Sequence, residues 1–155
     1  MANPSEWGPL LWKIIHITCE NLGRNTYNLL QIDELNAFQN FINKTGTVLP
    51  CVVCRKHYNA YYLKNKKKIV YNELKTYGKR YFYGLHEEVN NDNKVKGIEF
   101  IDLEKIYGHI EREELNILIK EFEKLFQKYI LYHYIHPNAV KDFLATLRML
   151  RSSMS

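Results

Sequence analysis

Apolar residues recur along most of this chain three, four and seven positions apart, which is the spacing of one face of an α-helix. The segments with this pattern are 11–22, 35–42, 74–89, 103–107, 115–130 and 140–147. Pro9 fits an early helical position, Gly46 fits a C-terminal stop, and Pro50 fits the first turn of a further helix. With only 7 Gly and 4 Pro in the chain, the pattern predicts an all-α protein with short connections.

The predicted helices fall into two groups along the chain. Residues 1–108 contain four longer segments and one short segment that ends at Tyr107, which predicts a bundle of four or five helices. Residues 109–155 contain two long amphipathic segments, which predict a helical C-terminal extension. Because its apolar stripes must be covered, we expect the extension to pack on the bundle or to form an interface with another chain.

Composition narrows the class of protein. The chain has 155 residues, of which 46% are hydrophobic and 14% are aromatic, so it can bury a core without metal or disulfide support. No run approaches the roughly 18 apolar residues that a membrane span needs. The first residues lack the basic and long apolar regions of a signal peptide. We therefore expect a cytoplasmic protein that is not associated with a membrane.

The formal net charge of +5 raises the question of nucleic-acid binding. The densest basic stretch is Lys64 with Lys66, Lys67 and Lys68. A surface that binds nucleic acid usually interleaves arginine and aromatic residues with its lysines, and this stretch does not. The lysines predict a solvated loop between two helices, and no nucleic-acid partner is expected.

Cysteine usage gives the strongest local signal. The chain has three cysteines, and Cys51 and Cys54 follow Pro50 at a spacing that brings both sulfurs together in the first turn of a helix. The unpaired amides and dipole of a helix N-terminus lower the pKa of a thiol. The pair is therefore a redox disulfide, half of a zinc site, or two buried structural cysteines. Cys19 stands alone and is expected to be a buried small residue.

Two kinds of site in which such a cysteine pair is common, a zinc site and a thioredoxin-like active site, fit this sequence poorly. A zinc site could combine the cysteines with His57 and His86, but no second paired motif stands nearby. A thioredoxin-like domain would place a β-strand before the cysteines, whereas residues 35–47 have helical spacing. The proline that such a domain needs later in the chain is also missing, since Pro137 lies in the extension.

Aromatic and polar side chains on two predicted helices suggest a binding site. Trp12 and His16 are four residues apart and share one helix face, and His86 and Asn90 repeat this spacing on another helix. Rings and a carboxamide in this arrangement suit a flat heterocycle, which they could stack on and hydrogen-bond to.

The order of these motifs resembles the Erv/ALR family of FAD-dependent sulfhydryl oxidases, and particularly its short viral members. The residues that carry the resemblance are Trp7, Gly8, Pro9, Trp12 and His16, then Pro50, Cys51, Cys54 and His57, then His86, Val89 and Asn90. The resemblance covers roughly residues 5–108. It implies a four-helix bundle with a short fifth helix, FAD held noncovalently among the helices, and a homodimer.

The resemblance also assigns roles to individual residues. It implies that Cys54 reacts with the flavin and that Cys51 meets the incoming thiol. The implied cofactor-binding residues are Gly8, Trp12, His16, His57, His86, Val89, Asn90, Lys96 and Tyr107. No metal is implied. Glu87 and the Asp92–Asn93 pair depart from the family pattern, which puts the contacts to the FAD phosphates in doubt.

The implied activity is that of a flavin-linked thiol oxidase, which forms disulfides in proteins and passes the electrons through FAD to O2, giving hydrogen peroxide. Many relatives carry a second cysteine pair as a shuttle, and this chain has none. Its partner would therefore be a dithiol-containing protein substrate or a thioredoxin-like carrier, met in the host cytoplasm or the virion if the source is viral. The extension would enlarge the dimer or dock that substrate. The alternative is a non-enzymatic helical module that binds zinc or a protein partner and uses the two cysteines structurally.

Overall fold

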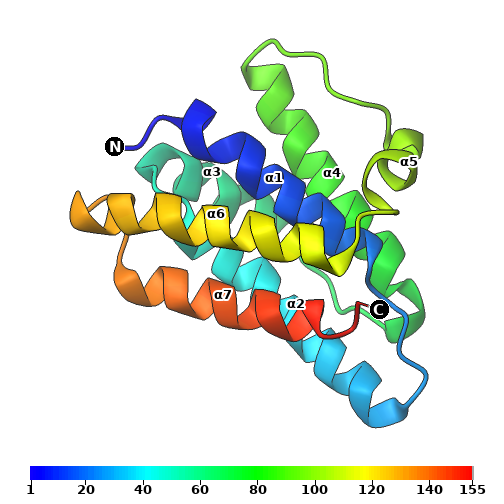
Figure 1. Ribbon diagram of the computed structural model, residues 1–155. Coiled ribbons are helices and arrows are strands. Elements are labelled where there is room, and N and C mark those ends of the chain that lie inside the picture. Colours follow the sequence, from blue (N-terminus) through cyan, green and yellow to red (C-terminus); the bar gives the residue numbers. More distant parts are fainter. Residues whose placement is uncertain (155) are drawn as a thin grey trace.

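The computed structural model describes residues 1–154, and within them it is all-helical, which confirms the prediction of an all-α protein (Figure 1). The helices are α1 (Pro4–Glu20), α2 (Asn28–Val48), α3 (Val52–Asn65), α4 (Leu74–Asp92), α5 (Leu103–Tyr107), α6 (Arg112–Leu131) and α7 (Pro137–Arg151). Two short 3₁₀ helices, η1 (Tyr71–Glu73) and η2 (Phe100–Asp102), lead into α4 and α5.

Helix α1 is the centre of the arrangement, because α4, α5 and α6 all pack against it. Helix α2 packs mainly against α7 and also contacts α3, which in turn contacts α4 (Figure 1). Aromatic side chains fill the space between the helices. The fully buried phenylalanines are Phe38, Phe41, Phe82, Phe122, Phe126 and Phe143.

The C-terminal helices take part in the same core as the first four. The ring of Phe143 on α7 stacks on Phe41 of α2 with centroids 5.4 Å apart, and Phe122 of α6 lies at the same distance from Phe143. The apolar stripes of the extension are therefore covered by packing on the bundle. The division of the chain at residue 108 stays a prediction.

Three predicted helix boundaries were wrong. Helix α1 begins at Pro4, where Asn3 caps it by accepting a hydrogen bond from the Ser5 amide at 3.0 Å, so Pro9 lies inside the helix. Pro9 therefore removes one interior backbone hydrogen bond. Gly46 does not end α2. A Cβ there would lie 2.7 Å from the Tyr58 ring, so this glycine permits close packing.

The third error concerns the start of α3. The helix begins at Val52 and not at Pro50, and Cys51 is its N-cap residue. Lys66 to Lys68 lie in the connection between α3 and η1, as predicted for a loop, whereas Lys64 lies in the last turn of α3 and not in that loop. Among the described residues, no helix is long and apolar enough to cross a membrane.

Candidate active site

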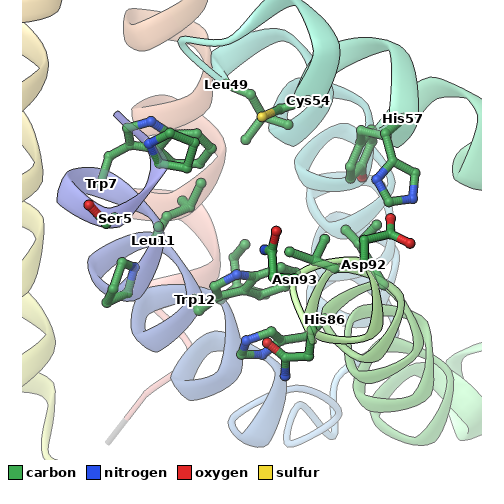
Figure 2. A pocket seen from close by; sticks show the side chains of 18 of the residues that line it. Ser5, Trp7, Leu11, Trp12, Leu49, Cys54, His57, His86, Asp92 and Asn93 are labelled. Carbon is green, nitrogen blue, oxygen red and sulfur yellow. The ribbon is translucent and has the colours of Figure 1, made fainter. Parts of the chain in front are cut away.

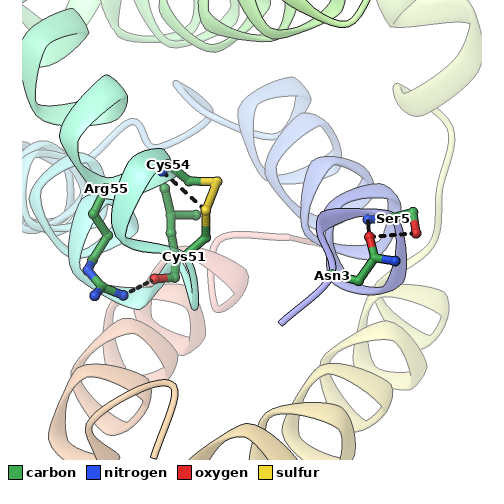
Figure 3. The surroundings of a disulfide bond; sticks show 6 residues. Asn3, Ser5, Cys51, Cys54 and Arg55 are labelled. Atoms are coloured by element: carbon green, nitrogen blue, oxygen red, sulfur yellow. Dashed lines mark hydrogen bonds between the residues drawn. A yellow bond between two sulfur atoms is a disulfide. The ribbon is translucent and has the colours of Figure 1, made fainter. Parts of the chain in front are cut away.

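Cys51 and Cys54 form a disulfide at the beginning of α3, with their Cα atoms 5.2 Å apart (Figure 3). The Cys51 sulfur also accepts a hydrogen bond from the Cys54 amide at 3.3 Å, as an N-cap side chain does. The two residues differ in accessibility, because Cys51 is only 2% exposed whereas Cys54 is partly exposed. The resemblance assigned the incoming thiol to Cys51, so that role requires the residues that cover its sulfur to move.

A cation, Arg55, follows Cys54 directly in the sequence. The guanidinium of Arg55 reaches back to the carbonyl of Leu49, to which it donates a hydrogen bond at 2.5 Å (Figure 3). The Arg55 amide donates to the Cys51 carbonyl at 3.0 Å. The guanidinium is thus engaged by a backbone carbonyl, and it is the free amides of the helix N-terminus that favour the thiolate form of a cysteine once the disulfide opens.

A cavity of about 780 Å³ opens beside Cys54, which is within the size range of small-molecule and cofactor sites. Figure 2 shows Cys54 and Leu49 at one end and Trp12 and His86 at the other. Seven of the predicted cofactor-binding residues line it, namely Gly8, Trp12, His57, His86, Val89, Asn90 and Tyr107. These residues come from α1, α3, α4 and α5, so the cavity lies where four helices meet.

The two helix faces that were predicted to form a ring-binding site do meet in space. Trp12 and His86 stack on each other with ring centroids 3.9 Å apart and an interplanar angle of 4°. The Nε2 atom of His16 lies 2.9 Å from the Nδ1 atom of His86, so one of these nitrogens donates and the other accepts. The stack leaves no room for a third ring between Trp12 and His86. A flat ligand must lie on an outer face of the stack or separate the two rings.

Burial controls the charge of both histidines. Burial, with a smaller contribution from the nearby His86, lowers the pKa of His16 to about 3. Burial also lowers the pKa of His86 to about 4. Both rings are therefore neutral at neutral pH, and each offers one donor and one acceptor nitrogen.

A second cavity, of about 420 Å³, adjoins the first and shares His86, Asn90, Val95 and Tyr107 with it. It contains the two remaining predicted residues, His16 and Lys96. The Tyr107 ring stacks on His16 at 5.1 Å, and burial raises the pKa of its hydroxyl. The predicted cofactor-binding residues are thus all found in two adjoining cavities.

His57 also has a structural contact. Its Nε2 atom lies 3.0 Å from a carboxylate oxygen of Glu88, which joins α3 to α4 beside the cavity. Cys19 is buried, its sulfur lies 3.6 Å from the Gly78 carbonyl, and burial raises its pKa. It occupies the small buried position that was predicted for it. No group of three or more His, Cys, Asp or Glu among residues 1–154 is arranged to hold a metal ion.

The sequence analysis omitted residues that also line the first cavity. Trp7 belongs to the motif but was not predicted to bind the cofactor, and its buried indole Nε1 has no hydrogen-bond partner in the described chain. The other omitted lining residues include Leu11, Thr45, Leu49, Tyr58 and Leu85. Leu11 and Leu85 lie in segments with helical apolar spacing, which does not separate a core side chain from a cavity wall, and Thr45, Leu49 and Tyr58 lie outside those segments.

No protein-family model, no curated protein and no solved structure matches this chain. A function for the chain is therefore inferred from its residues and from the geometry of the two cavities.

Proposed function

We propose that the protein is a flavin-linked sulfhydryl oxidase that uses Cys51 and Cys54 to form disulfides in other proteins. The observation that supports this proposal is that a disulfide cysteine, Cys54, lines the same cavity as the stacked Trp12 and His86 rings. A buried pair of cysteines with a purely structural role would need no adjoining cavity with ring-stacking walls. The homodimer and the use of O2 that the resemblance implies belong to this proposal.

The residues of the two cavities fit FAD in three respects. A Cβ at Gly8 would meet no atom within 4 Å, so this face of α1 is open to the cavity that Gly8 lines. The unpartnered Nε1 of Trp7 is a donor that a ligand can satisfy. Lys96 is the single Lys or Arg that lines either cavity of the described chain, and it would face the negative diphosphate.

The predicted cofactor-binding residues offer two kinds of contact to such a ligand. Trp12, His86 and Tyr107 offer ring faces, and Asn90 together with the neutral His16 offers hydrogen bonds. When bound, FAD supplies the chemistry that carries two electrons from a dithiol to O2, which becomes hydrogen peroxide.

The protein itself carries out the dithiol exchange. A thiolate of the substrate bonds to one sulfur of the Cys51–Cys54 pair, the bond between these two sulfurs breaks, and the other cysteine leaves as a thiolate. The second thiolate of the substrate then displaces the enzyme sulfur, so the substrate leaves oxidised and the pair is reduced by two electrons. The amides at the start of α3 would stabilise a thiolate that forms there.

The spectrum of the purified protein tests the proposal. We expect a yellow protein whose flavin absorption bleaches when dithiothreitol is added without air and returns when air is admitted. The Cys54→Ser variant should keep the yellow flavin and lose turnover. Oxidase activity that persists in Cys54→Ser, or a colourless wild-type protein with stoichiometric zinc, contradicts the proposal.

A further inference from the structure

Positive charge is concentrated in the part of the chain that carries the disulfide. Residues 35–72 contain seven Lys and Arg and no Asp or Glu. Outside this segment the chain has more acidic than basic residues. The positive net charge of the protein therefore originates in the segment that includes α3 and the loop after it.

Helix α3 has a solvent-facing side as well as a buried side. Tyr58 and Tyr61 face the core. On the opposite side lies one exposed strip that consists of Val52, Lys56, Asn59 and Leu63. These residues are three or four positions apart, which places them on one face of the helix. Val52 is 52% exposed and Leu63 is 56% exposed, so the strip presents apolar side chains to solvent. We call these four residues, with the flanking Val53, Ala60 and Lys64, the α3 strip.

The α3 strip begins beside the disulfide. Val52 and Val53 stand between the two cysteines in sequence, and both are exposed. From there the strip follows the 14 residues of α3, a length of about 20 Å at 1.5 Å per residue. A protein segment that lies along the strip would thus have one end at the first turn of α3, which also carries the disulfide. The Cys54 side chain itself projects from the other side of α3, where it lines the first cavity together with Tyr58.

The cations along this surface are largely free of acidic partners. Lys67 approaches Glu73 at 3.9 Å, and Lys44 approaches Asp142 at 3.8 Å. In the described part of the chain, no carboxylate lies within ion-pair distance of Lys56, Lys64, Lys66 or Lys68. Unpaired charges of one sign on one face attract a partner of the opposite sign and speed its association.

We propose that the α3 strip docks the substrate protein, and that this partner carries acidic residues interspersed with apolar ones next to its reactive cysteines. This inference rests on the proposed oxidase function, because the docked segment would end at the turn of α3 that carries the Cys51–Cys54 disulfide. A protein partner fits the strip better than a nucleic acid, since the exposed residues between Lys56 and Lys64 are Asn59, Ala60 and Leu63, none of which is aromatic. It also fits better than a membrane, since only a few apolar side chains project from the strip.

Two matched peptides test the inference. Each has about 12 residues, enough to span the strip when extended, and each contains Cys-Gly-Ser-Cys followed by Leu alternating either with Glu or with Lys. The readout is kcat/KM for the acidic peptide divided by kcat/KM for the basic peptide. Because both peptides react with the same disulfide, a substitution that changes the reactivity of the disulfide does not change this ratio. We expect a ratio of about ten at low salt for the wild-type protein, decreasing as salt is added.

Variants of equal charge change provide the control. Lys56→Glu with Lys64→Glu should bring the ratio to one or below, whereas Lys120→Glu with Lys124→Glu on α6 should leave it near the wild-type value. Circular dichroism of each variant checks that it is folded. A wild-type ratio of one, or an equal effect of the two double variants, overturns the docking inference even if dithiothreitol is oxidised normally.

A binding measurement separates failure of the docking inference from failure of the proposed function. Fluorescence anisotropy follows the same peptides with Ser in place of Cys, together with a single-stranded RNA and phosphatidylserine vesicles. The docking inference is supported if the wild-type protein binds the acidic peptide more tightly in a salt-sensitive way and the Lys56→Glu, Lys64→Glu double variant does not. This result stands even if the protein fails to oxidise dithiothreitol, which would contradict only the proposed oxidase function. Tighter binding of the RNA or the vesicles than of the acidic peptide overturns it.

Discussion

The hydroxyl of Tyr129 on α6 donates a hydrogen bond to the carboxylate of Glu6 in the first turn of α1, at 2.5 Å. Lys128 reaches the same carboxylate at 3.1 Å. Both hydrogen bonds lower the pKa of Glu6, and the one from Tyr129 makes the larger contribution. Because the neighbours of Glu6 in sequence, Ser5 and Trp7, line the first cavity, the C-terminal extension holds one wall of the candidate site.

Removal of the Tyr129 hydroxyl should weaken this attachment in a pH-dependent way. A carboxyl whose pKa is lower in the folded state contributes stability above its unfolded pKa, and this contribution is lost as the pH falls through the lowered folded value. We expect Tyr129→Phe to lower the melting temperature at pH 7 and to have a smaller effect at pH 3. Thermal unfolding followed by circular dichroism measures both values.

Tyr132→Phe is the control for this experiment, because Tyr132 is exposed and should tolerate the loss of its hydroxyl at either pH. An equal loss of stability in Tyr129→Phe at pH 7 and pH 3 would show that the effect comes from packing and not from the bond to Glu6.

The paired histidines predict a second pH dependence. The folded protein keeps His16 neutral down to its pKa of about 3, whereas an unfolded histidine titrates near 6.5. Between these values the unfolded chain binds more protons, so stability is complete above pH 6.5 and decreases as the pH falls. The buried His16 alone accounts for a loss of about 2 kcal/mol between pH 7 and pH 5. Urea unfolding at several pH values measures this loss.

The His16→Gln variant should show a shallower decrease with pH than the wild-type protein. His109→Gln changes an exposed histidine and serves as the matched control. Wild-type stability that is constant from pH 7 to pH 5 would be inconsistent with a neutral buried pair.

Two glycines inside helices should respond to alanine in opposite directions. At Gly8 the new methyl group meets no atom within 4 Å, so Gly8→Ala should stabilise the flavin-free fold by up to about 1 kcal/mol. At Gly78 the methyl group would lie 2.8 Å from Leu22 and 2.9 Å from Phe38. Gly78→Ala should therefore destabilise the fold by about 1–3 kcal/mol.

Flavin binding adds a second readout to this comparison. The Gly8 methyl group would occupy cavity space, so Gly8→Ala should retain less flavin than the wild-type protein although its fold is no less stable. Flavin content is measured from the absorption spectrum after purification, and stability from urea unfolding of the flavin-free protein. Unchanged flavin content in Gly8→Ala would argue against a ligand at this face of α1.

The parts of the structure that the sequence predicted share one physical basis. Helix positions followed from apolar periodicity, because burial of one face leaves a repeating pattern in the chain. Trp12 and His16 were expected on one helix face because four residues make about one turn, and the same reasoning applied to His86 and Asn90. Motif order indicated that these two faces belong together, and in the structure they meet.

Other features depend on tertiary packing that no local pattern reveals. The sequence did not indicate that Trp12 and His86 stack on each other, or that Tyr129 meets a residue 123 positions away. It also did not indicate that Cys51 is the more buried cysteine of the pair. Pro9 was misplaced because the cap formed by Asn3 begins α1 earlier than the proline suggests.

The unequal burial of Cys51 and Cys54 has a consequence for the sulfur at which an incoming thiol can attack. A small free thiol can reach Cys54 without rearrangement of the chain, and it then expels Cys51 as the leaving group. A docked protein that displaces the cover of Cys51 can instead form its covalent intermediate there. Under the proposed oxidase function, small reagents and protein substrates would therefore be trapped on different cysteines, and a small thiol used as a test reagent would not follow the route of a protein substrate.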